Sequence, residues 1–234
     1  MAEHHIEDAK SSLANCQNTL QKYLDDVITD TGLDNEALSE AIKLRCNYFK
    51  WTDLKTKLLS AEKSYVLPYR ALPNKISGYV YNYLYQDKKD IVEKYYKNDT
   101  NTGEYIICVN KKDVPLDAVE LLIHNLVLRR GNVVWVDFGF NVGREFGGRH
   151  PALILKNTQD TIIVLPLSSQ EPNNPSINVQ IDNVYGLPLK IRWGNILRIT
   201  PVSILRIDFS SHIGSVKNNV LKEISNKIGI YGIK

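Results

Sequence analysis

The stretch GNVVWVDFGFNVGREFGGRHPALIL, residues 131–155, decides the fold of the second half of the chain. An apolar run comes first, then a loop with four glycines and two arginines, then a second apolar run that begins at Pro151. Short apolar runs bounded by glycine and proline are typical of buried β-strands. Glycines let a long loop bend through backbone conformations that other residues rarely adopt. The stretch therefore predicts two strands, over 133–138 and 151–155, joined by a glycine-rich loop.

The sequence predicts further short strands after this pair. They lie at 161–167, 177–181 and 190–199, each bounded by Gly, Pro, Asn or Asp. Such a series describes a small, mostly antiparallel barrel. A closing helix that covers the barrel is predicted by apolar residues at helical spacing, namely Val216, Val220, Leu221, Ile224 and Ile228. We expect Gly229 and Gly232 to end this helix.

The first half of the chain has the pattern of helices. Apolar residues recur at helical spacing over 13–27 and over 38–49, on either side of the turn signal Thr31-Gly32. With Asp34 as a candidate N-cap, this pattern predicts a helical hairpin. A third helix is expected from about residue 52 to residue 61, before the prolines at 68 and 73.

Residues 76–97 fit either a helix or a strand, and their length favours a helix. Their tyrosines are interleaved with lysines. This composition suits either a stacking platform for nucleic-acid bases or tyrosines that pack against neighbouring helices, and packing is favoured. A strand at YIICV, 105–109, and a helix from Asp113 and Pro115 follow. We therefore predict an α+β chain with a mainly helical domain over 1–112 of unassigned role, a connecting helix over 113–128 and a barrel domain over 129–234.

Composition limits the class of protein. The 234 residues are 43% hydrophobic and 24% charged, which suits a folded chain with a sizeable core. Residues 1–125 carry 16 Lys and Arg against 19 Asp and Glu, a balance of −3, whereas residues 126–234 carry 13 against 7, a balance of +6. A polyanionic partner, if there is one, would therefore meet the second half, and an ordinary solvated surface explains the charge balance equally well. We expect a cytoplasmic protein with no membrane partner, and three reduced, partly buried cysteines.

The segments RGNVVWVDFGFNVGREFGGRHPALIL, TIIVLPLSS and HIGSVKNNVLKEISNKI resemble, in this order, the MazF/PemK family of type II toxin-antitoxin endoribonucleases. The resemblance covers residues 129 to about 230 and none of the first half. It implies an SH3-like barrel that forms a homodimer, a groove for single-stranded RNA, and a cognate antitoxin as partner. The implied reaction is attack of a ribose 2′-OH on the adjacent phosphate, with no metal or cofactor.

The resemblance also implies catalytic positions. Family members carry an arginine just before the proline of the second strand and a Thr or Ser after the third, and the hydroxyl position falls on Ser168. The arginine position holds His150, with Arg149 one place earlier. Either Arg149 clamps the phosphate or His150 transfers the proton, since an ordinary imidazole titrates near ~6.5. We favour joint action of the two; the contrary reading is that His150 only caps the loop and catalysis is lost.

Other residues are candidates for RNA binding. In the loop, Arg144 supplies charge and Glu145 orients an arginine by a charge-assisted hydrogen bond. A fifth-strand segment GNILRIT stands where the family usually has Gln-Ile-Arg-Thr, so base recognition or subunit pairing is expected to differ. The remaining candidates are Gly147, Gly148, Lys190, Arg192, Asn195 and Arg198.

The resemblance favours one function, and the sequence keeps others open. The favoured function is that of a toxin that cleaves single-stranded mRNA at specific sequences. The alternatives are a non-catalytic RNA- or protein-binding module on the same barrel, and a toxin that poisons DNA gyrase. The histidine at the arginine position separates the first two, while the GGRHP loop and Ser168 argue against the third.

Overall fold

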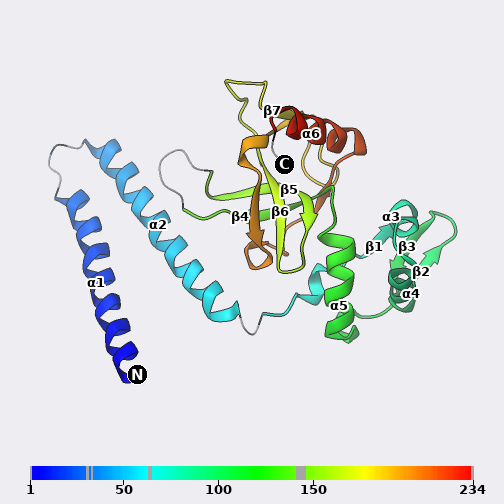
Figure 1. Cartoon of the computed structure of the whole chain (residues 1–234), viewed down its shortest axis with the longest axis horizontal. Coiled ribbons are helices and arrows are strands. Elements are labelled where there is room, and N and C mark those ends of the chain that lie inside the picture. Colours follow the sequence, from blue (N-terminus) through cyan, green and yellow to red (C-terminus); the bar gives the residue numbers. More distant parts are fainter. Residues whose placement is uncertain (1, 30–31, 33, 63–64, 141–145, 233–234) are drawn as a thin grey trace. The chain divides into compact units, whose positions relative to one another are not determined.

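The structure is a computed structural model, and it describes residues 2–29, 32, 34–62, 65–140 and 146–232 (Figure 1). The chain divides into two compact units, Met1–Ser60 and Ala61–Lys234. The division thus falls about 50 residues before the boundary at 112/113 that we placed from the sequence. None of the helices in the described part of the chain is both long and apolar enough to cross a membrane.

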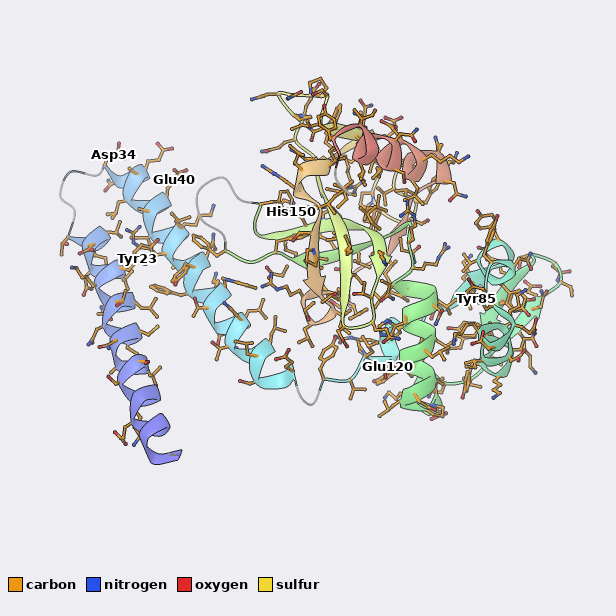
Figure 2. The ribbon with its side chains drawn as sticks, viewed as in Figure 1. Tyr23, Asp34, Glu40, Tyr85, Glu120 and His150 are labelled. Atoms are coloured by element: carbon orange, nitrogen blue, oxygen red, sulfur yellow. The ribbon has the colours of Figure 1, made fainter. Side chains whose placement is uncertain are left out.

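The first unit is an antiparallel pair of long helices, α1 (Ala2–Ile28) and α2 (Asn35–Ala61), as the hairpin prediction expected (Figure 2). Asp34 is the N-cap of α2, because its Oδ1 accepts a hydrogen bond of 2.8 Å from the Ala37 amide. The expected break near residue 52 is wrong, since no proline or glycine interrupts residues 35–61 and α2 continues. Tyr23 joins the helices, with the Arg45 guanidinium 4.3 Å from its ring centroid.

The three cysteines differ from expectation in one respect. Cys16, Cys46 and Cys108 are free thiols, but all three are exposed rather than partly buried. The two in the hairpin lie outside its narrow apolar seam, because a pair of helices covers only one stripe of each partner.

The second unit begins with a small mixed layer rather than with helices alone. Its elements are β1 (Lys75–Ser77), α3 (Gly78–Asn82), α4 (Gln86–Tyr95), β2 (Tyr96–Asp99) and β3 (Glu104–Ile107), with strand order β1-β3-β2. The single helix favoured for residues 76–97 is therefore wrong. Gly78 shows why the chain turns here: a Cβ on this residue would lie 2.6 Å from the Gly103 carbonyl oxygen, so two backbone segments touch.

A short helical segment links this layer to the large sheet. It comprises α5 (Leu116–Leu122) and a π-helical turn, Ile123–Val127, and agrees with the predicted helix after Pro115. The buried amide of Asn132 donates hydrogen bonds of 2.9 Å to the carbonyls of Leu126 and Val127. These bonds satisfy carbonyl groups at the helix end and fix the entry into the sheet.

The large sheet is antiparallel and curled, with strand order β10-β4-β5-β6-β8-β7 and β9 paired to β6 (Figure 1). Its strands are β4 (Asn132–Asp137), β5 (Arg149–Asn157), β6 (Thr161–Ser168), β7 (Asn178–Ile181), β8 (Arg192–Asn195), β9 (Thr200–Ser203) and β10 (Gly214–Ser215). The α+β class and the strands predicted at 133–138, 151–155, 161–167 and 177–181 are confirmed. The expected strand over 190–199 is instead β8 followed by a 3-10 turn, Ile196–Arg198, and β9 was not foreseen.

The two faces of the sheet pack against different partners. On β5, Ala152 and Ile154 belong to the core that includes α5 and β1, whereas Leu153 and Leu155 belong to a second core. That second core includes Ile224 of the closing helix α6 (Asn218–Ile230), as predicted. Gly229 falls inside the last turn of α6, so it does not end the helix, whereas Gly232 lies beyond its end with φ +65°.

Candidate functional site

The loop between β4 and β5 is closed at its base by glycines. The Phe138 amide donates to the Gly148 carbonyl at 2.9 Å, and the Gly148 amide donates to the Gly139 carbonyl at 2.6 Å. Gly139 (φ +87°) and Gly148 (φ +79°) adopt the left-handed conformations expected of them. The Gly148 amide is thus used inside the loop and not offered to a phosphate, while Gly147 is half-buried. Arg144 and Glu145 lie outside the described residues.

His150 and Ser168 project from the same face of the sheet. Ala152 of β5 lies opposite Pro166 of β6, and His150 and Ser168 each lie two residues beyond this pair on their own strands. Side chains directly opposite each other in an antiparallel pair share a face, as do side chains two residues apart on one strand. The imidazole and the hydroxyl that the resemblance singled out are therefore on one surface.

The environment of His150 favours its neutral form. Burial lowers the pKa of the His150 imidazole below its ordinary value, against the opposing effect of hydrogen bonds to the backbone of Gly147 and Leu167. The ring also contacts Phe146, with centroids 4.4 Å apart. An uncharged imidazole at neutral pH can accept a proton, which is what a general base requires.

Arg149 projects from the opposite face. Its Nη2 lies 2.5 Å from Asp208 Oδ2 and 2.5 Å from Ser211 Oγ, and its guanidinium lies 4.6 Å from the Trp135 ring centroid. Together with the turn at 186–188, Trp135 and Arg149 line a cavity of about 450 Å³. The expected joint action of Arg149 and His150 does not fit this placement, because adjacent residues of a strand point to opposite sides.

The ion pair with Arg149 affects Asp208. Burial raises the pKa of the Asp208 carboxyl, but hydrogen bonds from Ser210, Arg149 and Ser211 together outweigh burial and hold that pKa well below its usual range. The positive charge of Arg149 and the negative charge of Asp208 are therefore paired within the protein.

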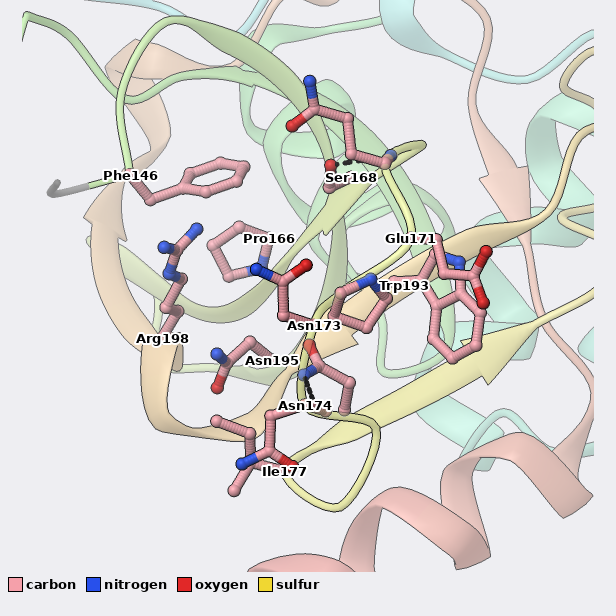
Figure 3. Close-up of a pocket in the computed structure, with 13 residues that line it drawn as sticks. Phe146, Pro166, Ser168, Glu171, Asn173, Asn174, Ile177, Trp193, Asn195 and Arg198 are labelled. Atoms are coloured by element: carbon pink, nitrogen blue, oxygen red, sulfur yellow. Dashed lines mark hydrogen bonds between the residues drawn. The ribbon is translucent and has the colours of Figure 1, made fainter.

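A second pocket, of about 280 Å³, opens beside Ser168 (Figure 3). Ser168 Oγ accepts a hydrogen bond of 3.0 Å from the Gln170 amide, which fixes the start of the following loop. Arg198 is exposed, and its guanidinium lies 5.3 Å from the ring centroid of Phe146, the residue that also contacts His150. Asn195 lines the same pocket, so Ser168, Asn195 and Arg198 are brought together.

Two of the expected RNA contacts lie elsewhere. The side chain of Arg192 is buried, and it donates hydrogen bonds to the carbonyls of Lys190 at 3.0 Å and Pro188 at 3.2 Å. Arg192 therefore holds the 188–190 turn, and an RNA contact does not fit its burial. Lys190 is exposed on this turn, outside the residues that line the pocket beside Ser168.

Sequence reasoning missed several residues of this pocket. Trp193 stands opposite Ser168 in the β6–β8 pairing and lines the pocket with Phe146 and Glu171. The alternation of Trp193 and Asn195 around Gly194 was a signal that both face one side of a strand. The contribution of residues 170–178 carries no such signal, because a loop's position depends on the strands that it joins.

Comparison with protein families finds a match for the second half of the chain. Residues 129–231 match the family model described as "PemK-like, MazF-like toxin of type II toxin-antitoxin system", and residues 1–128 lie outside the match. The resemblance drawn from the sequence is confirmed over this range. A search of curated proteins found no match to the chain.

Solved structures are also similar to part of the chain. The Mycobacterium tuberculosis toxin MazF-mt6 is 15% identical, over 43% of this chain and 93% of its own, with a TM-score of 0.33. MazF from Deinococcus radiodurans is 21% identical, over 45% of this chain and 96% of its own, with a TM-score of 0.38. A MazE-MazF structure from the same organism is 20% identical, over 46% of this chain and 98% of its own, with a TM-score of 0.35.

Proposed function

We propose that residues 129–231 are the toxin domain of a toxin-antitoxin pair and cleave single-stranded RNA, with His150 and Ser168 in the reaction. The family match supports the class, since MazF-like toxins are generally endoribonucleases. The observation that supports the proposed site is the antiparallel pairing of β5 with β6, because His150 and Ser168 each lie two residues beyond the pair Ala152–Pro166. Ser168 and Arg198 line one pocket.

The proposed reaction needs a base, an acid and a stabiliser of negative charge. Neutral His150 takes the proton from the ribose 2′-OH, the 2′-oxygen forms a bond to phosphorus, and the bond to the 5′-oxygen breaks. The leaving 5′-oxygen takes up a proton from water, and His150 returns its proton to the solvent, which leaves a 2′,3′-cyclic phosphate and a 5′-hydroxyl. Ser168 donates a hydrogen bond to a phosphate oxygen and so stabilises the negative charge that develops on the phosphate.

This assignment places a histidine where the family has an arginine. A guanidinium stays protonated and acts mainly on charge, whereas a neutral imidazole exchanges a proton near neutral pH. We infer that the two roles are divided here, with proton transfer assigned to His150 and stabilisation of the phosphate charge to Ser168.

The partners are part of the proposal. Single-stranded RNA is the substrate, a cognate antitoxin binds the domain, and the domain pairs as a homodimer. The exposed Arg198 and the balance of +6 over residues 126–234 favour a polyanionic substrate.

The test is incubation of the purified full chain with a long single-stranded RNA in EDTA, followed by mapping of the cut ends. We expect discrete cuts that leave 2′,3′-cyclic phosphates. RNA that remains intact while it binds the protein would contradict the enzyme assignment and favour a binding module. One observation supports that second function: His150 is half-buried against Phe146, and a ring packed in this way is less accessible to the 2′-OH of a bound RNA.

A further inference from the structure

Side-chain amides are the most frequent polar groups in the pocket beside Ser168. Five of the thirteen residues that line it carry carboxamides, namely Gln170, Asn173, Asn174, Asn178 and Asn195. Trp193 and Phe146 add two aromatic rings. Carboxamides and flat rings are the groups with which proteins read and stack unpaired bases.

Local hydrogen bonds orient two of these amides. The Asn195 Oδ1 accepts from the Leu197 amide at 2.9 Å, and the Asn174 Oδ1 accepts from the Ser176 amide at 3.0 Å. Each bond orients the amide so that its nitrogen, a donor, is directed away from the bonded backbone group. These two positions therefore favour a ligand that presents acceptors.

Charged groups stand on opposite sides of the pocket. Arg198 lies on the side of Phe146, and Glu171 lies on the far side, with Asn173 and Asn195 between them in the view (Figure 3). One end of the pocket thus donates hydrogen bonds, while the other accepts them. A ligand with acceptors on one edge and donors on another matches this order.

Guanine is the base with that pattern. It presents the O6 and N7 acceptors on one edge, which arginine contacts more often than any other base edge, and N–H donors at N1 and N2 on another. Adenine places an amino donor where guanine has O6, so it opposes Arg198. The volume of about 280 Å³ is at the small end of ligand pockets, which start near ~300 Å³, and suits one base.

We propose that this pocket binds a single guanine of single-stranded RNA beside the phosphate that is cut. Arg198 contacts O6 and N7, Glu171 accepts from the N1 and N2 hydrogens, and the amides of Asn174 and Asn195 support the acceptor edge. Trp193 supplies a stacking surface. The position of the base relative to the cut rests on the proposed function, whereas the choice of base rests on the pocket.

The test measures binding without cleavage. Fluorescence anisotropy of the full chain is recorded with 2′-O-methyl oligonucleotides of about five residues, within the ~4–16 nucleotides that single-strand sites occupy. Each contains one guanine, or inosine (no N2 amine), 7-deazaguanine (no N7) or adenine at that place. We expect each replacement to weaken wild-type binding at least about fivefold, the lower bound for losing a bidentate base contact.

Variants connect each penalty to a residue. Glu171→Gln should remove the penalty for inosine and keep that for 7-deazaguanine, and Arg198→Gln should do the reverse. Glu120→Gln and Arg70→Gln, which make the same changes at exposed residues outside the pocket, are the matched controls and should keep both penalties.

The outcomes separate this inference from the proposed function. Equal wild-type binding of all four oligonucleotides, or penalties that persist in both variants, overturns the guanine site even if RNA is cut. Guanine-selective binding that depends on Glu171 and Arg198 supports the site even if no RNA is cut, in which case only the proposed catalysis fails. Absence of wild-type binding to any of them overturns both.

Discussion

Arg149 and Asp208 form an ion pair of 2.5 Å on the face of the sheet opposite to His150. The pair joins the start of β5 to the segment after residue 207, and Ser211 Oγ completes it at 2.5 Å from Arg149 Nη2. Arg149 therefore stabilises the fold by linking these two segments.

Replacing Arg149 should cost stability rather than catalysis. We expect Arg149→Ala to lower the free energy of unfolding by about 1 kcal/mol, because both partners are partly exposed and the Trp135 contact is lost as well. RNA cleavage should stay within about threefold of wild type. Urea unfolding and cleavage rates test this expectation, and a loss of about tenfold or more in cleavage at unchanged stability would return Arg149 to the catalytic site.

Asp208 should make the protein sensitive to acid. Because its folded-state pKa is depressed, the stabilisation is present above the unfolded value of ~3.9 and is lost as pH falls below it. The free energy of unfolding, measured in urea between about pH 3 and pH 6, should fall less steeply with acid in Asp208→Asn than in wild type. Parallel curves for the two proteins would contradict this role.

His150 should set the pH dependence of cleavage. Burial lowers its pKa, so as a base it should cause the rate to rise with pH, with an inflection below ~6.5 and a plateau at neutral pH. The inflection should vanish in His150→Arg, which restores the family residue, and in His150→Gln. A profile that is the same in all three proteins would exclude proton transfer by His150.

Ser168 should matter through its hydroxyl. We expect Ser168→Ala to lower cleavage at least about tenfold and Ser168→Thr to retain most of it. Ser169→Ala, a change at the exposed neighbour, is the control for effects on the loop. Because Ser168 Oγ also accepts from the Gln170 amide, thermal unfolding of each variant is needed beside the rates. Wild-type cleavage by a folded Ser168→Ala protein would remove Ser168 from the site.

Gly78 should be intolerant of a side chain. A Cβ there would lie 2.6 Å from the Gly103 carbonyl oxygen, and backbone cannot move aside as a flexible side chain does. We expect Gly78→Ala to cost about 1–3 kcal/mol of unfolding free energy, the usual range for overpacking. Gly229→Ala has no atom within 4 Å of its Cβ and lies in α6, so it should be neutral or slightly stabilising. Similar unfolding curves for both variants would contradict the close contact.

The helical hairpin and the first four strands of the large sheet followed from the sequence, because they depend on local period. Helical spacing and the absence of proline are properties of neighbouring residues, and so are the short apolar runs that became β4 to β7. Proline and glycine residues also predicted the ends of these strands. The family resemblance then named Ser168 and the position of His150.

Only the tertiary structure decided how these residues combine. The ion pair of Arg149 with Asp208 and the approach of residues 170–178 to Trp193 join segments that are distant along the chain. The burial of Arg192 depends on the turn at 188–190, which folds back on this residue. The layer over 75–107 also escaped local reasoning, because its strands gain stability only from pairing with each other. Period and composition indicate which secondary structure a segment can form, whereas contacts across the sheet determine which charges are paired inside the protein and which stay exposed.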